Sequence, residues 1–205
     1  MKRIAVFASG SGSNFEAIVE ATRVGRLVDT EVALLVCDKP GAQVLERSDR
    51  LGIEAFVFDP KDYPDKAAFE KEIAAQLQQR DVSLVVLAGY MRLLGSVMLS
   101  AFEGQIINLH PSLLPAFPGR DAIGQALTYG VKVTGVTVHF VDSGLDTGPI
   151  IAQVPVPVEE GDTAESLGAR IHQVEHGLLV DVIGRVLSGR VTLEGRIVHL
   201  LQAKS

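Results

Sequence analysis

The 205-residue sequence has one cysteine, no tryptophan and no long hydrophobic run. The single cysteine, Cys37, cannot form an internal disulfide, which is typical of proteins from a reducing compartment such as the cytoplasm. No apolar stretch reaches the roughly 20 residues of a membrane-spanning helix. The apolar run after Arg3 meets a glycine-rich turn too early for a signal peptide. We therefore expect a cytoplasmic protein that does not bind membranes and whose first strand begins near residue 3.

An excess of positive charge is also missing. The sequence has 25 acidic and 19 basic residues, a net charge of −6, which disfavours nucleic acid as a partner and favours a small molecule. Hydrophobic residues make up 47% of the chain and charged residues 21%, a balance typical of a well-buried globular core. A chain of this length most simply forms one domain, 1–205, with lobes of about 1–100 and 101–205.

Strand-like and helix-like segments alternate through the first half of the chain. The apolar runs lie at 4–8, 31–37, 55–58 and 83–88, and the amphipathic stretches between them at 14–23, 41–51 and 65–79. This alternation predicts an α/β fold with a doubly wound, mainly parallel, Rossmann-like sheet that is flanked by helices and joined by right-handed crossovers.

The second half begins with antiparallel strands. Two β-branched runs, 133–141 and 150–158, flank a turn at 142–149 that is rich in glycine and aspartate. Pro155 and Pro157 cannot donate hydrogen bonds to a neighbouring strand, so the second run is expected at the edge of the sheet.

A long helix and a hairpin are expected at the end of the chain. The helix is predicted over about 163–187, with Asp162 and Glu165 in capping-box spacing at its start and Gly189 after its end. The segment 190–200 is predicted to form a final hairpin or strand.

A loop rich in glycine and serine, residues 9–14, separates the first strand from the first helix. Glycines permit a sharp turn, and the free N–H groups of a helix N-terminus attract phosphate; Ser13 and Glu16 also have capping-box spacing. An ordinary tight turn has the same composition. A dinucleotide site remains an alternative: Phe15 occupies the place of the third glycine, but Asp38 could act as the ribose-binding carboxylate.

Asn108 and His110 follow an apolar run, 105–107, that is predicted to be a buried strand. Residues two apart in a strand share one face, and Pro111 forces the chain to turn. Asp146 lies in the glycine-bounded turn. Taken separately, such a histidine is more often structural than catalytic, and such an aspartate is more often a turn former. Together they offer a donor, a group that titrates near neutral pH and a charge, which favours acid–base chemistry.

Four segments carry a resemblance to a known family. Ser-Gly-Ser-Gly-Ser-Asn at 9–14, Ala-Gly-Tyr-Met-Arg-Leu-Leu at 88–94, Asn-Leu-His-Pro-Ser-Leu-Leu-Pro-Ala-Phe-Pro-Gly at 108–119, and 136–149 occur in this order. The sequence resembles the 10-formyltetrahydrofolate-dependent formyltransferases over nearly its whole length. It is most similar to the members that formylate glycinamide ribonucleotide in de novo purine biosynthesis. The N-terminal lobe would then bind phosphate, and the C-terminal lobe would hold the catalytic and folate sites.

The resemblance implies a role for each matching residue, with 10-formyltetrahydrofolate as co-substrate and without a metal. The implied catalytic residues are Asn108, His110 and Asp146; those for the phosphate and ribose of the substrate are Gly12, Ser13, Asn14 and Glu175; those for folate are Lys66, Met91, Arg92, Leu93, Leu94, Asn108, Asp142 and Asp146. The backbone groups of Arg92 and Leu94 would contact the pterin-like ring. The stretch 120–124 lacks the histidines that some members carry, which leaves any contact there in doubt.

These roles are chemically consistent. A neutral amine attacks the formyl carbon, and negative charge develops on the formyl oxygen. Asn108 and a protonated His110 would stabilise that oxygen, while Asp146 would keep the imidazole charged and help to move a proton through water to the folate nitrogen. His139 is either a partner of Asp146 or a strand histidine bonded to the backbone. The turn 142–148 is expected to be mobile, since its glycines and polar residues leave little to fix it.

Several other functions fit parts of the sequence. The run from His172 to His176 matches His-x-x-Glu-His, a zinc-peptidase signature that also needs a third ligand. A formyltetrahydrofolate deformylase and a methionyl-tRNA formyltransferase have similar cores, but the resemblance leads us to expect an extra regulatory or RNA-binding domain in each. A nicotinamide-dependent oxidoreductase would give Asn108, His110 and Asp146 no role. We expect a monomer or a weak homodimer.

Overall fold

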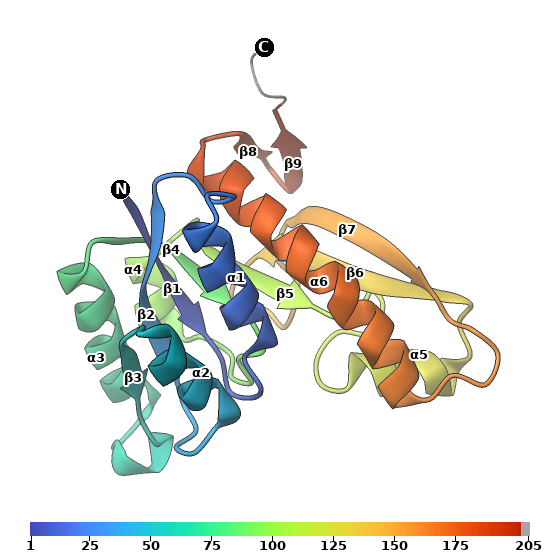
Figure 1. Cartoon of the computed structure of the whole chain (residues 1–205), viewed down its shortest axis with the longest axis horizontal. Helices are drawn as coiled ribbons and strands as arrows, with labels where there is room; N and C mark the ends of the chain where they lie inside the picture. Colours follow the sequence, from blue (N-terminus) through green and yellow to red (C-terminus); the bar gives the residue numbers. More distant parts are fainter. Residues whose placement is uncertain (202–205) are drawn as a thin grey trace. The chain divides into compact units, whose positions relative to one another are not determined.

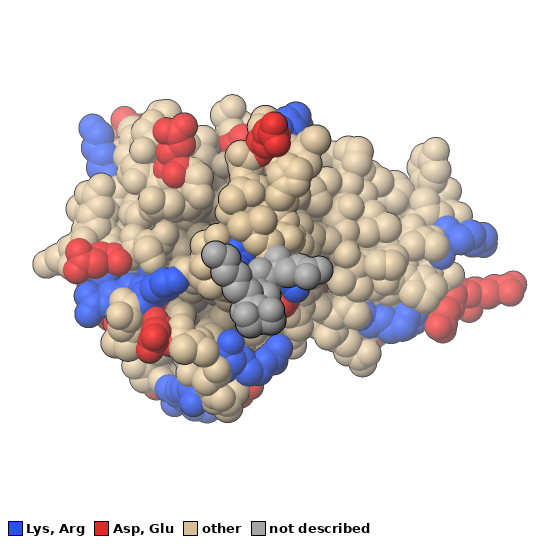
Figure 2. All heavy atoms as spheres, turned by 90° about the horizontal axis from the view of Figure 1, so that it is seen from above, with Lys and Arg blue, Asp and Glu red and all other residues tan. Residues whose placement is uncertain are grey.

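A computed structural model describes residues 1–201 of the chain (Figure 1). The chain forms two compact units, Met1–Asn108 and Leu109–Ser205. The expectation that the two lobes act as a single domain stays a prediction. None of the helices within residues 1–201 combines the length and apolar character that crossing a membrane requires. On the face shown in Figure 2, basic and acidic side chains are scattered among larger neutral areas.

Unit Met1–Asn108 contains the alternating elements that the sequence predicts. They are β1 (Lys2–Phe7), α1 (Ser13–Arg23), β2 (Thr30–Cys37), α2 (Gln43–Leu51), β3 (Ala55–Val57), the 3-10 helix η1 (Pro60–Asp62), α3 (Lys66–Gln79), β4 (Val82–Leu87) and α4 (Ser96–Ala101), followed by β5 (Ile106–His110) at the boundary of the units. The short helices η1 and α4 were not predicted. The interior of β1, Ile4 to Phe7, is fully buried, as expected of a central strand covered on both faces.

Unit Leu109–Ser205 combines a strand pair with helices and a hairpin. Its elements are α5 (Ala122–Tyr129), which was not predicted, β6 (Val133–Phe140), β7 (Ile150–Pro157), α6 (Ala164–Leu187), β8 (Val191–Glu194) and β9 (Ile197–Leu200). Strands β6 and β7 are antiparallel, as are β8 and β9. Helix α6 packs on β6 and β7. The predicted C-terminal hairpin is confirmed.

The main sheet has seven strands in the order β3-β2-β1-β4-β5-β6-β7. The pairs from β3 to β5 are parallel, and the order reverses direction beside β1, as in doubly wound folds. The predicted fold class is therefore confirmed. Strand β7, which carries Pro155 and Pro157, lies at the edge of the sheet, as their missing N–H groups require.

The parallel register brings several polar segments to one edge of the sheet. Phe7 at the end of β1 pairs with Val36 and Leu87, and Leu87 pairs with Asn108. The segments that follow β1, β2 and β4 therefore leave the sheet at the same level, which is where open α/β sheets bind ligands.

The start of α1 differs from the prediction. The proposed capping box of Ser13 and Glu16 is wrong: Gly12 is the N-cap, and no side chain caps the helix. Gly12 has φ 78°, and a Cβ there would lie 2.4 Å from the Val44 side chain, so glycine is required on both grounds. The Glu16 carboxylate pairs instead with Arg47 and Arg50 of α2.

The start of α6 also differs from the prediction. The capping box predicted for Asp162 and Glu165 is wrong, because Thr163 is the N-cap and exchanges hydrogen bonds with Ser166. Asp162 accepts the Glu159 N–H and pairs with Arg170 instead. Two overlapping cap sequences are present here, and the helix adopts the one that begins at Thr163.

Candidate active site

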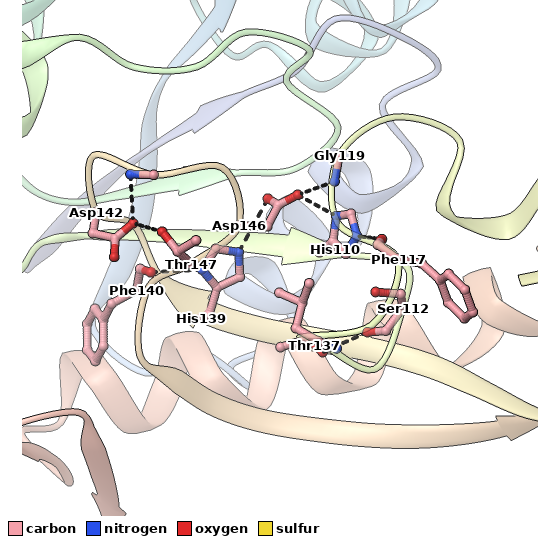
Figure 3. Close-up of polar contacts among 12 residues, drawn as sticks. His110, Ser112, Phe117, Gly119, Thr137, His139, Phe140, Asp142, Asp146 and Thr147 are labelled. Carbon is pink, nitrogen blue, oxygen red and sulfur yellow. Dashed lines mark hydrogen bonds and ion pairs between the residues drawn. The ribbon is translucent and has the colours of Figure 1, made fainter. Parts of the chain in front are cut away.

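His110 and Asp146 meet in unit Leu109–Ser205 (Figure 3). His110 is the last residue of β5, and Asp146 lies in the turn between β6 and β7. The His110 Nδ1 and the Asp146 Oδ2 are 3.4 Å apart, and the two side chains are 7% and 11% exposed. The structure therefore brings together two of the three residues for which a catalytic role was predicted.

Both ring nitrogens of His110 face acceptors. Nε2 lies 2.8 Å from the Phe117 carbonyl oxygen, which can only accept a hydrogen bond, so this nitrogen carries a proton. Nδ1 faces the Asp146 carboxylate across a distance longer than a normal hydrogen bond. A ring protonated on both nitrogens satisfies both partners, and Nδ1 is the nitrogen that a ligand can share.

Asp146 is held from several sides. Its backbone has φ 54°, a left-handed conformation that aspartate tolerates better than most residues. Its Oδ2 accepts the Gly119 N–H at 2.7 Å, and its Oδ1 lies 3.7 Å from His139 Nε2. Burial alone would raise the pKa of Asp146, but the contacts with His139, the Gly119 amide and His110 outweigh burial and lower this pKa. The carboxylate is therefore kept ionised.

His139 fits both readings of the sequence. On β6, its Nδ1 lies 2.8 Å from the Phe140 carbonyl oxygen, and its Nε2 faces Asp146 (Figure 3). The backbone contact requires a proton on Nδ1 and so fixes how the ring presents its other nitrogen to the carboxylate.

A buried threonine supports the loop that joins His110 to α5. Thr137 of β6 is fully buried; its hydroxyl donates to the Ser112 carbonyl and accepts the Leu114 N–H (Figure 3). The same loop supplies Phe117 to His110 and Gly119 to Asp146. Thr137 was not identified from the sequence, since a threonine in a strand carries no sign of such a contact.

The turn from Asp142 to Thr147 is better fixed than the sequence suggests. The Asp142 Oδ1 accepts the Gly144 N–H at 3.0 Å and the Thr147 hydroxyl at 2.6 Å. Arg196, in the β8–β9 hairpin, donates to the Thr147 carbonyl at 2.5 Å. The premise that little fixes this turn is wrong, while its mobility stays a prediction.

Asn108 and the glycine loop lie in unit Met1–Asn108. Asn108 is half-buried and precedes His110 by two residues on β5, so the two share one side of the strand. Gly12, Ser13 and Asn14 form the N-terminus of α1, where backbone N–H groups have no partner within a helix.

The predicted folate segment, Met91 to Leu94, follows β4 outside regular structure. Met91 and Leu93 are 62% and 53% exposed, so both apolar side chains are available to contact a ligand. Lys66 lies beside the end of this segment: its Nζ is 3.9 Å from Glu70, whose Oε1 accepts the Gly95 N–H at 2.5 Å.

Asp38 does not occupy the position of a free ribose-binding carboxylate. Its Oδ1 accepts the Ser9 hydroxyl at 2.5 Å, and its Oδ2 accepts Arg92 Nε at 2.6 Å. The dinucleotide reading therefore loses the carboxylate on which it depended.

Glu175, predicted to receive a ribose, lies on α6 and is 4% exposed. His172 Nδ1 is 2.8 Å from its Oε2, and this hydrogen bond raises the pKa of His172. The glutamate of the zinc signature is thus hydrogen-bonded to the first histidine of that signature. Within residues 1–201, no group of three or more histidine, cysteine and acidic side chains is placed to hold a metal ion.

The family model described as formyl transferase matches residues 2–183. The chain belongs to the formyl transferase family. It is 56% identical to phosphoribosylglycinamide formyltransferase of Bacillus subtilis, over 91% of this chain and 95% of that protein. This membership confirms the resemblance seen in the sequence and overrides the zinc-peptidase and oxidoreductase readings.

Solved structures agree. Glycinamide ribonucleotide transformylase 1 from Symbiobacterium toebii is 50% identical, with a TM-score of 0.96 over 98% of this chain and 95% of that one. The enzyme of the same name from Geobacillus kaustophilus is 61% identical, with a TM-score of 0.88 over 91% and 99% of the two chains. The fold is thus that of the transformylases.

Proposed function

We propose that this chain transfers the formyl group of 10-formyltetrahydrofolate to the amine of glycinamide ribonucleotide, a step of de novo purine biosynthesis. It is a phosphoribosylglycinamide formyltransferase, an enzyme of one-carbon transfer. The His110–Asp146 pair is the observation that carries the chemistry, since a buried imidazole is placed 3.4 Å from a carboxylate whose pKa is lowered. The similarity to the Bacillus subtilis enzyme supports the choice of substrates.

The reaction needs no nucleophilic side chain. The lone pair of the substrate amine forms a C–N bond to the formyl carbon, and the carbonyl electrons move to oxygen. When the intermediate collapses, the bond between that carbon and the folate nitrogen breaks, and the amine proton is transferred to the departing nitrogen. Both products are then neutral at the reacting atoms.

His110 and Asn108 stabilise the intermediate. Because Nε2 of His110 is occupied by Phe117, the Nδ1 proton is the one that reaches the formyl oxygen. The Asn108 amide supplies a second donor. One such donor is typically worth about a hundredfold or more in kcat.

Asp146 has two roles. Its negative charge stabilises positive charge on His110, and it accepts protons through water on their way from the amine to the folate nitrogen. The lowered pKa keeps Asp146 ionised, which the first of these roles requires.

The remaining residues bind the substrates. Gly12, Ser13 and Asn14 hold the ribonucleotide phosphate through the N-terminus of α1. Glu175 accepts hydrogen bonds from the ribose. The residues proposed to bind folate are Met91 to Leu94, Asp142 and Lys66, with Lys66 assigned to its acidic tail. The partners are small molecules, the compartment is the cytoplasm, and the chain is a monomer or a weak homodimer.

An absorbance assay for loss of the formyl group tests this function. With the purified chain and 10-formyltetrahydrofolate, tetrahydrofolate should form only after glycinamide ribonucleotide is added. Equal rates with and without the ribonucleotide would identify a formyltetrahydrofolate deformylase instead. Absence of any turnover in both mixtures would reject both functions.

A further inference from the structure

Asp38 connects two segments that are distant in sequence. It follows β2, and its side chain is 7% exposed. One carboxylate oxygen accepts the Ser9 hydroxyl at 2.5 Å, and the other accepts Arg92 Nε at 2.6 Å. The contact with Arg92 is charge-assisted, and the contact with Ser9 has an ionised acceptor, so both belong to the stronger class of hydrogen bonds.

The contacts of Asp38 with Ser9 and Arg92, here called the bridge, extend to Met91, the residue before Arg92. The Met91 N–H donates to the Ser9 hydroxyl at 3.0 Å, and the Ser9 N–H donates to the Gly89 carbonyl at 3.0 Å. Met91 is thus fixed through its backbone and Arg92 through its side chain, and both contacts lead to the same buried carboxylate. The bridge orients two consecutive residues of the segment.

Packing alone would not hold this segment in place. Met91 and Leu93 are more than half exposed, and the segment has no regular hydrogen bonding. Few buried apolar contacts and exposed backbone are the features of regions that open easily. The buried Asp38 carboxylate bonds to Ser9 after β1 and to Arg92 after β4, and these contacts restrain the segment.

We propose that Asp38 is a positioning residue that holds Met91 and Arg92 in the conformation that binds folate. This inference rests on the proposed function. It also gives the Arg92 side chain a role away from the ligand, since its Nε is bonded to Asp38, and leaves its backbone groups for the ring. Ser9 connects Asp38 to the loop that leads to Gly12. The proposed folate segment and the proposed phosphate loop are therefore both attached to Asp38.

Asp38→Asn tests the inference because it keeps the shape of the side chain and removes its charge. We expect the KM for 10-formyltetrahydrofolate to rise about fivefold or more, as for loss of a charge-assisted hydrogen bond. We expect kcat to change less than about twofold, because His110 and Asp146 are untouched. In the ligand-free protein, hydrogen exchange of the Met91 amide should become faster.

Ser9→Ala gives an independent test that removes a single hydroxyl and is less disruptive to folding. It should also raise the folate KM and speed exchange at Met91. The double variant should be no worse than the worse single one, since residues of one network act non-additively. Additive effects in the double variant would contradict a common bridge.

Asp59→Asn is the matched control. Asp59 follows the buried Phe58 near the end of β3, and its carboxylate accepts the Lys61 N–H at 2.9 Å. It should leave both KM values and the exchange at Met91 unchanged. An Asp38→Asn protein with wild-type folate KM and wild-type exchange would overturn the inference. Inactive wild-type protein would instead reject the proposed function, and the exchange measurement would still test the bridge.

Discussion

The two units hold their site residues in different ways. In Leu109–Ser205, the His110 and Asp146 side chains are 7% and 11% exposed and are contacted by backbone groups as well as side chains. In Met1–Asn108, the exposed residues Met91 and Leu93 belong to a segment that depends on Asp38. A rigid, buried pair suits chemistry, whereas an exposed, bridged segment suits binding. Changes in the His110–Asp146 pair should therefore alter kcat, and changes in the segment Met91 to Leu94 should alter KM.

The largest effect should come from His110. We expect His110→Ala to lower kcat by about a hundredfold, through loss of an oxyanion donor, while substrate affinities change little. Asn108→Ala should lower turnover by at least about tenfold for the same reason. Steady-state kinetics measures both, and circular dichroism checks the fold. Wild-type turnover by a folded variant would remove that residue from the mechanism.

Asp146→Asn should have the next largest effect, about tenfold on kcat, because the residue acts through His110 and through water. It also makes a prediction about stability. The folded-state pKa of Asp146 is lowered, so its ionised form stabilises the protein above the ordinary pKa of about 4, and this contribution is lost as pH falls through the lowered value.

Urea denaturation at several pH values measures this contribution. The difference in unfolding free energy between the wild type and Asp146→Asn should be greatest near neutral pH and should shrink as pH falls below about 4. A difference that stays constant over this range would show that ionised Asp146 does not stabilise the fold.

Arg196→Gln should have a smaller effect, and it should change the folate KM although Arg196 belongs to unit Leu109–Ser205. The Arg196 guanidinium holds the Thr147 carbonyl, next to Asp146, and lies beyond residue 183, where the family match ends. We expect a rise of about threefold in the folate KM, as for an exposed charge-assisted hydrogen bond, and faster amide exchange over 142–148. Arg190→Gln is the control, since Arg190 directly precedes β8 and its Nε donates to the Ser188 hydroxyl at the end of α6. Equal amide exchange over 142–148 in the two variants would show that the Arg196–Thr147 hydrogen bond does not restrain this turn.

The sequence predicts the framework better than the contacts. Strands such as β6 and β7 are visible because apolar runs and prolines act locally. The caps of α1 and α6 were mispredicted because Ser13 and Asp162 each compete with a neighbour for the same role. Residue types and spacing made His110 and Asp146 candidates, and the family motifs that contain them gave each its predicted role.

Contacts between distant residues leave no local pattern. Asp38 and Arg92 are 54 positions apart, and Thr147 and Arg196 are 49 apart. A carboxylate after a strand and an arginine in a hairpin turn are both common in proteins, so neither indicates its partner. Such contacts depend on the register of the sheet and on the turn that follows, which only coordinates provide.

The smallest effect should come from His172, whose side chain is 58% exposed although its partner Glu175 is buried. Because the pKa of His172 is raised in the folded protein, protonated His172 contributes stability below its ordinary pKa of about 6.5, and this is lost as pH rises through the raised value. His172→Gln should therefore destabilise the protein more at pH 6 than at pH 9, and solvent screening keeps both differences small.

If Glu175 receives the ribose, His172→Gln should change the KM for the ribonucleotide by about twofold and leave the folate KM unchanged, since an exposed hydrogen bond orients the carboxylate only weakly. His199→Gln is the control, because His199 lies 3.6 Å from the exposed Glu194 in the hairpin. A change in the folate KM without one in the ribonucleotide KM would contradict the assignment of Glu175 to the ribose.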